Sequence, residues 1–451
     1  MLQYKTEIMP IQYVPSGRSA SEIAADVETA VRDGRLRPGE SLPPVRTLAA
    51  ELQVSPATVA SAYRDLRVKG VARGQRRAGT RITGAPPVAP RPPLAVPAGA
   101  RNLISGSPDP AFLPALPALR RAASATAPAS SPRLYSDPAV SPRLAALASA
   151  RFGDDGIDPA NLAVVSGALD GVERVLAAWL RRGDRVAVED PGYAPLLDLL
   201  TALDLTILPM SLDDSGVRPE SLVRALSSGC HAAVFVPRAQ SPTGAAWDAT
   251  RAAELAGVLD SAPDVLVIED DHAGEVAGVP AQTVTIGRSR WAAIRSVSKT
   301  LGPDLRLALL AGDAVTVARV EGRQALGPGW VSYLLQDTVA GLWQDQATAR
   351  LLKQASAAYA RRRARLIADL AAAGTAATGL TGMAVWVPVA DEVGTTSGLL
   401  DRGWAVAPGQ RFRIASPPGI RIGVATLTAS ESRLLAADLT SVLRRRSQRS
   451  D

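Results

Sequence analysis

The stretch SVSKTLGPDLRL, residues 296–307, places a lysine between two hydroxyl-bearing residues, just ahead of a Gly-Pro turn. It overlaps an apolar run, WAAIRSV at residues 291–297, which has the length and composition of a buried strand. A lysine amine at the rim of a sheet is partly desolvated, so its pKa falls and it becomes nucleophilic. The stretch therefore predicts that Lys299 is a reactive amine at the carboxyl end of a strand.

Short apolar segments alternate with helix-like segments on both sides of this stretch. The apolar segments are 161–167, 185–190, 231–237, 264–271, 291–299 and 305–312. This alternation indicates an α/β fold with a large, mostly parallel sheet that is covered by helices on both faces. Active sites in such sheets gather at the carboxyl ends of the strands. Asp190, Ser241, Asp270 and Lys299 all follow apolar strands.

The residue types near Lys299 suit pyridoxal phosphate (PLP), an aldehyde cofactor that forms a Schiff base with a lysine amine. Its pyridine nitrogen needs a carboxylate, and Asp270 follows the apolar run VLVIE. Its phosphate needs backbone N–H groups, hydroxyls and an arginine, and the turn SGAL at residues 166–169 opens a helix. The nearby hydroxyls and arginine are Ser296, Ser298 and Arg306. Each feature is weak alone, and their combination and order predict a PLP site.

A smaller unit of a different kind precedes this one. Ser19 and Glu22 have the spacing of a capping box, which predicts the start of a helix that Gly34 ends. Residues 45–52 predict a short second helix, and Ser55 caps a third that begins at Pro56. Helix, tight turn and capped helix make a helix-turn-helix, whose second helix would offer Thr58 and Ser61 to the major groove of DNA.

The charge of the chain is concentrated in this smaller unit. Residues 1–84 hold 13 Lys or Arg against 8 Asp or Glu, and the whole chain has a formal net charge of +7. Residues 71–82, VARGQRRAGTRI, alternate around two glycines and predict a short basic hairpin, or wing. A basic patch on a small domain indicates a phosphate-binding surface, although a solvated face is the alternative on charge alone.

Residues 18–83 closely resemble a GntR-type winged helix-turn-helix, through DGRLRPGESLPPVRTLAAELQVSPATVASAYRDLRVKG followed by RRAGTRI. The resemblance implies that this domain, at about residues 10–84, binds double-stranded DNA. The implied DNA-contacting residues are Arg46, Thr58, Ser61, Arg64, Arg77, Gly79 and Thr80. A three-helix dimerisation module without a DNA role is the alternative.

A proline-rich linker, residues 85–100, separates this domain from residues 101–445. The latter resemble fold-type I aminotransferases, PLP-dependent transferases in which a large sheet is joined to a smaller C-terminal lobe; residues 383–414 fit that lobe. The arrangement of residues 18–440 looks like the MocR/GabR family of transcriptional regulators. The resemblance implies that Lys299 forms the Schiff base, that Asp270 pairs with the pyridinium and that Tyr193 stacks on the ring. Ala168 and Leu169 with Ser296 and Arg306 would hold the phosphate, and Arg421 would bind an effector carboxylate.

Two positions depart from the family's pattern. The motif NPTG is SPTG here, so Ser241 stands where an asparagine binds the cofactor's phenolic oxygen. The motif EDDY is EDDH here, so His272 replaces a tyrosine that serves the same oxygen. Three interpretations stay open: drift because turnover is not needed, loss of tight PLP binding, or a specialised cofactor environment.

Composition argues against several other functions. Cys230 is the single cysteine, so no intrachain disulfide forms, and with His231 and His272 as the only histidines a zinc site is not expected. No apolar run reaches the ~18–20 residues that span a bilayer, and the first ten residues do not resemble a signal peptide. We expect a cytoplasmic protein without a membrane segment or a bound metal.

Three functions fit these observations. The first is a homodimeric regulator that binds an operator and responds to an amine, an amino acid or PLP itself. The second is an active PLP-dependent aminotransferase with an accessory N-terminal domain. The third is a DNA-binding protein that keeps the scaffold without PLP. The basic wing and the changes at Ser241 and His272 favour the first, and we do not expect ordinary aminotransferase turnover.

Overall fold

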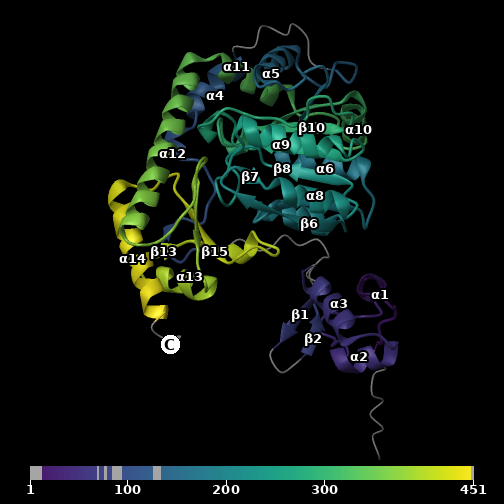
Figure 1. Cartoon of the computed structure of the whole chain (residues 1–451). Coiled ribbons are helices and arrows are strands. Elements are labelled where there is room, and N and C mark those ends of the chain that lie inside the picture. The colour runs from purple at the N-terminus through teal and green to yellow at the C-terminus, as the bar shows by residue number, and fades with distance from the viewer. Residues whose placement is uncertain (1–12, 69–70, 76–78, 84–93, 125–133, 448–451) are drawn as a thin grey trace, which may run out of the picture. The chain divides into compact units, whose positions relative to one another are not determined.

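The chain forms two compact units, Met1–Pro92 and Pro93–Asp451, in this computed structural model (Figure 1). The structure describes all residues except 1–12, 69–70, 76–78, 84–93, 125–133 and 448–451. The division falls inside the predicted linker, of which residues 94–100 are described. Each unit has a hydrophobic core of its own.

The first unit contains three helices and a hairpin. Its elements are α1 (Ala20–Arg32), α2 (Val45–Leu52), α3 (Pro56–Val68), β1 (Ala72–Gln75) and β2 (Gly79–Ile82). The predicted caps are present: Ser19 Oγ accepts the N–H of Glu22 at 3.2 Å, and Ser55 Oγ accepts that of Thr58 at 3.1 Å. Gln53 turns the chain between α2 and α3 in the left-handed region, with φ of 54°.

The core of this unit comes from one face of each of the three helices. Ile23 and Val27 of α1, Leu48 of α2, and Val59 and Leu66 of α3 are completely buried. Strands β1 and β2 pair antiparallel, with Arg73 opposite Arg81. The unit is therefore a helix-turn-helix followed by a wing.

An eight-stranded sheet forms the centre of the second unit. Its strands are β4 (Leu162–Val165), β5 (Arg185–Asp190), β6 (Thr206–Asp213), β7 (Gly216–Val217), β8 (Ala232–Phe235), β9 (Leu266–Asp271), β10 (Trp291–Ser296) and β11 (Ala308–Gly312). Their spatial order is β4-β11-β10-β9-β8-β5-β6-β7. Strands β10, β9, β8, β5 and β6 are parallel, whereas β11 and β7 run antiparallel to their neighbours. Strands β6 and β7 are not among the predicted segments.

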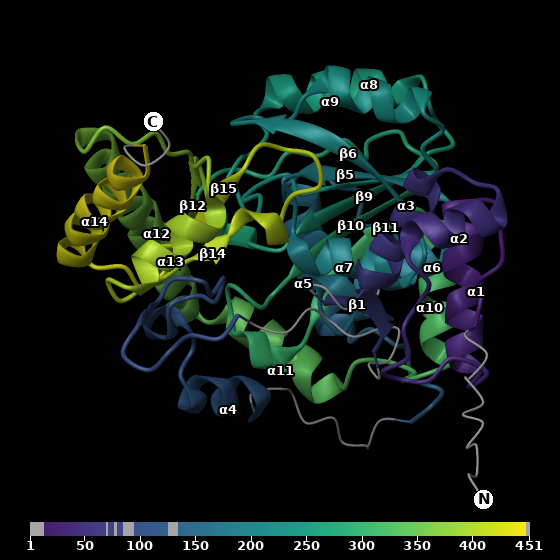
Figure 2. The same ribbon diagram turned by 90° about the horizontal axis from the view of Figure 1, so that it is seen from below.

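Helices cover both faces of this sheet (Figure 2). One face packs against α5 (Pro142–Asp154), α8 (Pro219–Ser227), α9 (Ala249–Asp260) and α11 (Tyr333–Gln344), to which α4 (Leu116–Ser124) adds. The other face packs against α6 (Ala168–Trp179), α7 (Ala194–Ala202) and α10 (Ala314–Ala325). Because successive strand residues point to opposite faces, Val186 and Ala187 enter different cores.

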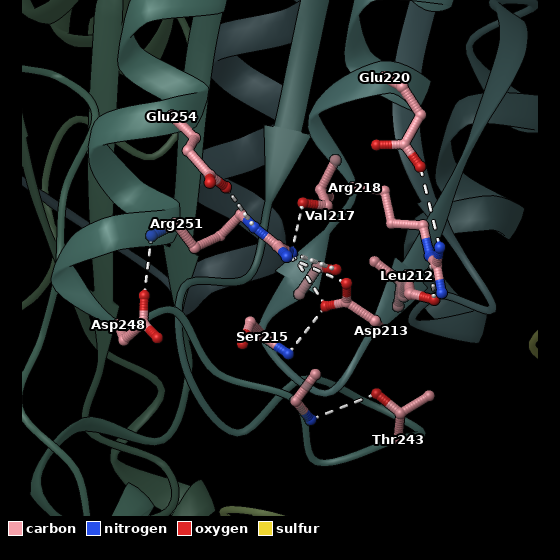
Figure 3. A network of polar contacts seen from close by, with 12 residues as sticks. Leu212, Asp213, Ser215, Val217, Arg218, Glu220, Thr243, Asp248, Arg251 and Glu254 are labelled. Atoms are coloured by element: carbon pink, nitrogen blue, oxygen red, sulfur yellow. Dashed lines mark hydrogen bonds and ion pairs between the residues drawn. The ribbon is translucent and has the colours of Figure 1, made fainter.

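Arg251 joins α9 to the edge of the sheet (Figure 3). Its guanidinium donates to both carboxylate oxygens of Asp213 in β6, at 2.9 and 3.0 Å, and to the carbonyl of Val217 in β7 at 2.9 Å. Asp248 caps the same helix by accepting the N–H of Arg251 at 2.7 Å. One arginine thus holds together three neighbouring elements.

The smaller lobe follows a long helix, α12 (Gln346–Ala372). It holds the sheet β12-β15-β14, formed by Ala384–Pro388, Gly419–Gly423 and Ala407–Pro408, together with α13 (Glu392–Leu400) and α14 (Ala429–Ser447). Strand β3 (Arg101–Asn102) pairs parallel with β13 (Trp404–Ala405), so the start of the second unit belongs to this lobe. The short 3₁₀ helices are η1 (Pro110–Phe112), η2 (Gly274–Ala277), η3 (Pro303–Leu305) and η4 (Gly409–Arg411).

Candidate cofactor site and DNA-binding surface

A cavity of about 340 Å³ lies at the carboxyl ends of the central strands. All the residues predicted to hold the cofactor line it, together with the predicted carboxylate-binding arginine. They are Ala168, Leu169, Tyr193, Ser241, Asp270, His272, Ser296, Ser298, Lys299, Arg306 and Arg421. The structure thus brings these side chains together, while the role of each stays a prediction.

Lys299 lies in the turn after β10 and is half-buried. Its Nζ donates a hydrogen bond to the carbonyl oxygen of Gly106. Burial, and then the positive charge of Arg421, lower the pKa of Lys299 to about 8. The predicted desolvated amine is therefore present, with a useful fraction unprotonated near neutral pH.

Asp270 lies in β9 and is 5% exposed. Its Oδ1 is buried and has no hydrogen-bond partner among the residues that the structure describes. Burial, and then the charge of Asp271, raise the pKa of Asp270 to about 7. Asp271 itself pairs with Arg238 and Arg295, at 2.7 and 2.9 Å. Among the described residues Asp270 forms no ion pair, although the charge of Lys299 acts on it, and a pyridinium nitrogen would supply such a partner.

The phosphate would lie between the N-terminus of α6 and Arg306. The first N–H groups of a helix have no intrahelical acceptor, and here they include those of Ala168 and Leu169. Arg306 donates through Nη2 to the carbonyl of Ser166 at 2.8 Å. Gly167 has φ of 109°, and a Cβ there would come within 2.6 Å of that Nη2. The chain therefore needs glycine where the arginine approaches the helix N-terminus.

Ser296 and Ser298 add hydroxyl groups to the same region. Ser296 is 6% exposed, and its Oγ accepts the N–H of Ser298 at 3.1 Å. The side chain of Ser298 is half-buried. Ser296 ends β10 and Ser298 precedes Lys299 directly, so these two hydroxyls and the amine come from the end of one strand and the turn that follows it.

Two aromatic rings face the cavity. The rings of Tyr193 and His272 are nearly parallel, with an interplanar angle of 12° and centroids 6.3 Å apart. Burial, and then the charge of Lys299, lower the pKa of His272 to about 4, so its imidazole is neutral near pH 7. A neutral imidazole can donate one hydrogen bond. The three interpretations of Ser241 and His272 stay open.

Arg421 lies in β15 and is 7% exposed. Its Nη1 donates to the carbonyl of Ile104 at 3.0 Å, and its Cζ lies 5.9 Å from the ring centroid of Phe412. Its Nε has no hydrogen-bond partner among the described residues. Burial lowers the pKa of Arg421 to about 10, so the guanidinium remains positive and suits a carboxylate.

Other lining residues had no signal in the sequence. Gly106 contacts Lys299 across 193 positions, and Thr381 and Met383 come from the segment before β12. Asp190 follows a buried strand as Asp270 does, yet it lines a different cavity. Its carboxylate accepts the N–H groups of residues 414–416 at 2.7 to 2.8 Å, so it anchors a loop.

The predicted DNA-contacting residues lie on α2, α3 and the wing. Arg46 and Arg64 are exposed, whereas Thr58 and Ser61 are half-buried. The hydroxyls of Thr58 and Ser55 lie 2.8 Å apart. Gly79 and Thr80 begin β2. Arg77 lies outside the described residues, so its place in the wing stays a prediction.

The described residues contain no helix long and apolar enough to cross a membrane. Within the same part of the chain, no group of three or more His, Cys, Asp or Glu side chains is placed to hold a metal ion.

Comparisons with known proteins match both units. Residues 102–439 match the model of the aminotransferase class I and II family, and residues 19–82 match that of bacterial regulatory proteins of the gntR family. The chain is 40% identical over 438 residues to the vitamin B6 salvage pathway transcriptional repressor PtsJ of Salmonella typhimurium, covering 95% of this chain and 99% of that protein. It is 30% identical over 278 residues to the pyridoxine biosynthesis transcriptional regulator PdxR of Corynebacterium glutamicum, covering 58% of each.

Solved structures share the fold of the second unit. The kynurenine aminotransferase of Pyrococcus horikoshii has a TM-score of 0.70 at 21% identity, covering 77% of this chain and 92% of that chain. LysN, the α-aminoadipate aminotransferase of Thermus thermophilus, has a TM-score of 0.68 at 19% identity, covering 77% and 93%. The predicted fold class, a winged helix-turn-helix followed by an α/β aminotransferase-like fold, is confirmed.

Proposed function

The chain belongs to the MocR/GabR family of transcriptional regulators, in which a gntR-type domain is joined to an aminotransferase-like domain, and from this premise we propose that it is a PLP-binding regulator. The proposal has four parts: PLP in the cavity around Lys299, an amine, amino acid or PLP as the signal, an operator bound by residues 10–84, and a homodimer. Lys299, Asp270 and Arg306 converge on one cavity, and this convergence carries the proposal.

The side chains fit PLP in charge and in hydrogen bonding. The unpaired carboxylate oxygen of Asp270 suits the pyridinium nitrogen, and the N-terminus of α6 with Arg306 suits the phosphate. The cofactor would supply an aldehyde that condenses with the amine of Lys299 and releases water. Tyr193 would stack on the ring, and His272 would lie near its phenolic oxygen.

The residues of the chain prepare the site for this reaction. The lowered pKa of Lys299 leaves part of the amine unprotonated near pH 7, which is the form that attacks a carbonyl carbon. Asp270 would hold a proton on the pyridine nitrogen by remaining ionised beside it. Arg421 would bind the carboxylate of an amino-acid effector, next to the reactive amine.

Exposed apolar side chains support a homodimer. Leu134, Tyr135, Leu326 and Leu334 are 63%, 94%, 92% and 74% exposed, and Tyr135 contacts the ring of Trp330 at a centroid distance of 5.6 Å. Exposed apolar side chains of this size favour burial against a second copy. The regulator would act in the cytoplasm, where a bacterial operator lies.

The decisive experiment is a titration of the full chain with PLP, followed by visible absorbance. After borohydride reduction, mass spectrometry should locate the cofactor on Lys299. The variant Lys299→Ala should lose the covalent link, while Lys353→Ala, which removes an exposed lysine of α12, should keep it. A cofactor attached elsewhere, or an empty site in the wild type, would refute the assignment.

The aminotransferase alternative has its own test. The protein is supplied with an amino donor, a keto-acid acceptor and PLP, and the product is measured over many catalytic cycles. We expect at most slow turnover. Sustained turnover at the ~1–10³ per second of ordinary enzymes would make the protein an enzyme instead.

A further inference from the structure

The described part of the linker, residues 94–100, leads into a segment that reaches the cofactor cavity. Residues 94–106 include β3, which ties this segment to the smaller lobe through β13. Within these thirteen positions the chain contacts an apolar cluster, Arg421 and Lys299 in turn. The segment is continuous with the linker that leads to the winged helix-turn-helix.

Leu94 anchors the start of this segment. It is half-buried and packs against a cluster of Ala194, Trp386, Ala407 and Phe412. The four cluster residues are between 1% and 9% exposed. The cluster joins the N-terminus of α7 to the sheet of the smaller lobe, so Leu94 packs against a cluster that draws on both parts of the second unit.

Residues of this cluster also shape the cofactor cavity. Ala194 follows Tyr193, whose ring faces the cavity. Phe412 lies beneath the guanidinium of Arg421, and its carbonyl accepts the N–H of Gly192 at 2.6 Å. A shift of Tyr193 or Arg421 would therefore move the surface on which Leu94 rests.

The far end of the segment is hydrogen-bonded to two of the cationic side chains that line the cavity, Arg421 and Lys299. The carbonyl of Ile104 accepts a hydrogen bond from Arg421 at 3.0 Å, and that of Gly106 accepts one from the Nζ of Lys299. Arg421 and Lys299 are also the residues proposed to bind an effector carboxylate and the aldehyde. On binding a ligand, Arg421 would exchange the carbonyl of Ile104 for the carboxylate of the effector. Lys299 would exchange the carbonyl of Gly106 for a bond to the aldehyde carbon.

We propose that residues 94–106 transmit the state of the cofactor site to the linker, with Leu94 as the anchor; this inference rests on the function proposed above. A lysine ammonium carries three hydrogens. When the amine condenses with an aldehyde, a C=N bond forms, the carbonyl oxygen leaves as water, and at most one hydrogen remains on the nitrogen. Gly106 then loses the donor that holds its carbonyl, and the segment shifts between two positions.

Hydrogen–deuterium exchange of the full-length wild type, with and without PLP, tests the first half of this inference. Residues 94–100 do not line the cavity, so a bound molecule does not shield them directly. We expect their exchange rates to rise at least about threefold when PLP is linked to Lys299, and to stay unchanged in Lys299→Ala. Unchanged exchange in a wild type that shows the PLP absorbance would overturn the inference.

The variant Leu94→Ala tests the second half. The probe is a duplex that the PLP-free wild type selects from a random-sequence library, and its Kd is measured with and without PLP. We expect the variant to keep its PLP absorbance and to lose about fivefold of the PLP-dependent change in Kd. Val96→Ala, in the same segment but outside the cluster, is the matched control and should behave as wild type.

The outcomes separate this inference from the function on which it rests. If the wild type binds neither PLP nor DNA, the proposed function fails. If the wild type responds to PLP and Leu94→Ala responds equally, the proposed function stands and the transmission through residues 94–106 is wrong. If Leu94→Ala misfolds, the hydrogen–deuterium exchange of the wild type with and without PLP still tests the inference.

Discussion

The buried carboxylate of Asp270 destabilises the folded protein when no positive charge lies beside it. Its pKa is about 7 in the folded state, against about 3.9 when unfolded. A raised folded pKa means that stability is lost as the pH rises toward 7, because the unfolded chain ionises first. Asp270→Asn should therefore stabilise the PLP-free protein at pH 8 by on the order of 4 kcal/mol. Denaturant unfolding between pH 4 and pH 8 measures this.

The increase in the free energy of unfolding caused by Asp270→Asn should grow from pH 4 to pH 7 and stay constant above pH 7. The same variant should bind PLP more weakly, because the pyridinium loses its counter-charge. Asp190→Asn is the comparison, since that carboxylate accepts three backbone N–H groups and its replacement should only destabilise. An equal loss of stability in both variants would contradict the assignment of Asp270.

The amine of Lys299 should make PLP attachment depend on pH. Because its pKa is about 8, the unprotonated fraction rises about tenfold per pH unit below 8 and levels off above. Stopped-flow absorbance after mixing with PLP should follow this curve. Arg421→Gln removes a positive charge that lowers this pKa, so the plateau should move to higher pH. A profile still rising steeply at pH 10 would show an ordinary, solvated lysine.

Individual residues differ in how far the sequence alone predicts them. Lys299 and Asp270 stand at strand ends beside other PLP-type residues, and the cavity contains both. Asp190 has the same local pattern, but its partners lie more than 220 positions away. No local sequence pattern predicts a role for Gly106. It contributes only a backbone carbonyl, and the fold places the accepting oxygen next to Lys299, which is far away in the sequence.

Arg251 shows how one side chain stabilises a whole sheet edge (Figure 3). Arg251→Lys would lose the paired bonds to Asp213 and the bond to Val217, which should cost about 1 kcal/mol. Arg251 holds the pKa of Asp213 below its usual range, so its contribution is present above the unfolded pKa and is lost as the pH falls below about 4. Urea unfolding at pH 7 and pH 3 measures both effects.

Arg218→Lys is the matched control for Arg251→Lys. Arg218 lies 3.8 Å from Glu220, and both side chains are about half exposed, so its replacement should change stability little. A loss of equal size for both arginines would contradict the role given to the Arg251 network.

The recognition helix makes a prediction about DNA. Arg64→Ala on α3 and Arg46→Ala on α2 should each weaken binding and lower the salt dependence by about 0.9 in the slope of log K against log salt, because each removes a phosphate contact. Fluorescence anisotropy at several salt concentrations measures this. Arg361→Ala, which removes an exposed charge from α12, should leave both quantities unchanged.

Whole elements are predictable where their signals are local. The helices of the first unit begin at Ser19 and Ser55 because these residues cap them. The sequence does not predict β6, because Pro209 and alternating polar residues interrupt its apolar pattern, and nothing local gives the antiparallel direction of β11. Edge pairing and strand direction depend on neighbours that the sequence places far away.

The second unit is closed by contacts between its beginning and its end. Strand β3 pairs with β13, and Arg101 forms an ion pair of 2.7 Å with Glu431, some 330 positions later. Leu94 likewise packs against the cluster that contains Trp386 and Phe412. Local sequence patterns therefore identify two units of different type. They do not show how the linker packs against the second unit, because those contacts join residues that are far apart in the sequence.

Two separate cores predict two thermal transitions in calorimetry. The core of the first unit is built wholly within residues 23–82, and the cavity belongs wholly to the second. PLP at 100 times its Kd should stabilise the second unit by about 2.7 kcal/mol, which raises its Tm by about 3 °C, and leave the transition of the first unit in place. Lys299→Ala should lose most of that shift. If PLP moved both transitions together, the winged helix-turn-helix would unfold as part of the cofactor-binding unit. The free energy that couples the two units would then be larger than the packing of Leu94 alone can supply.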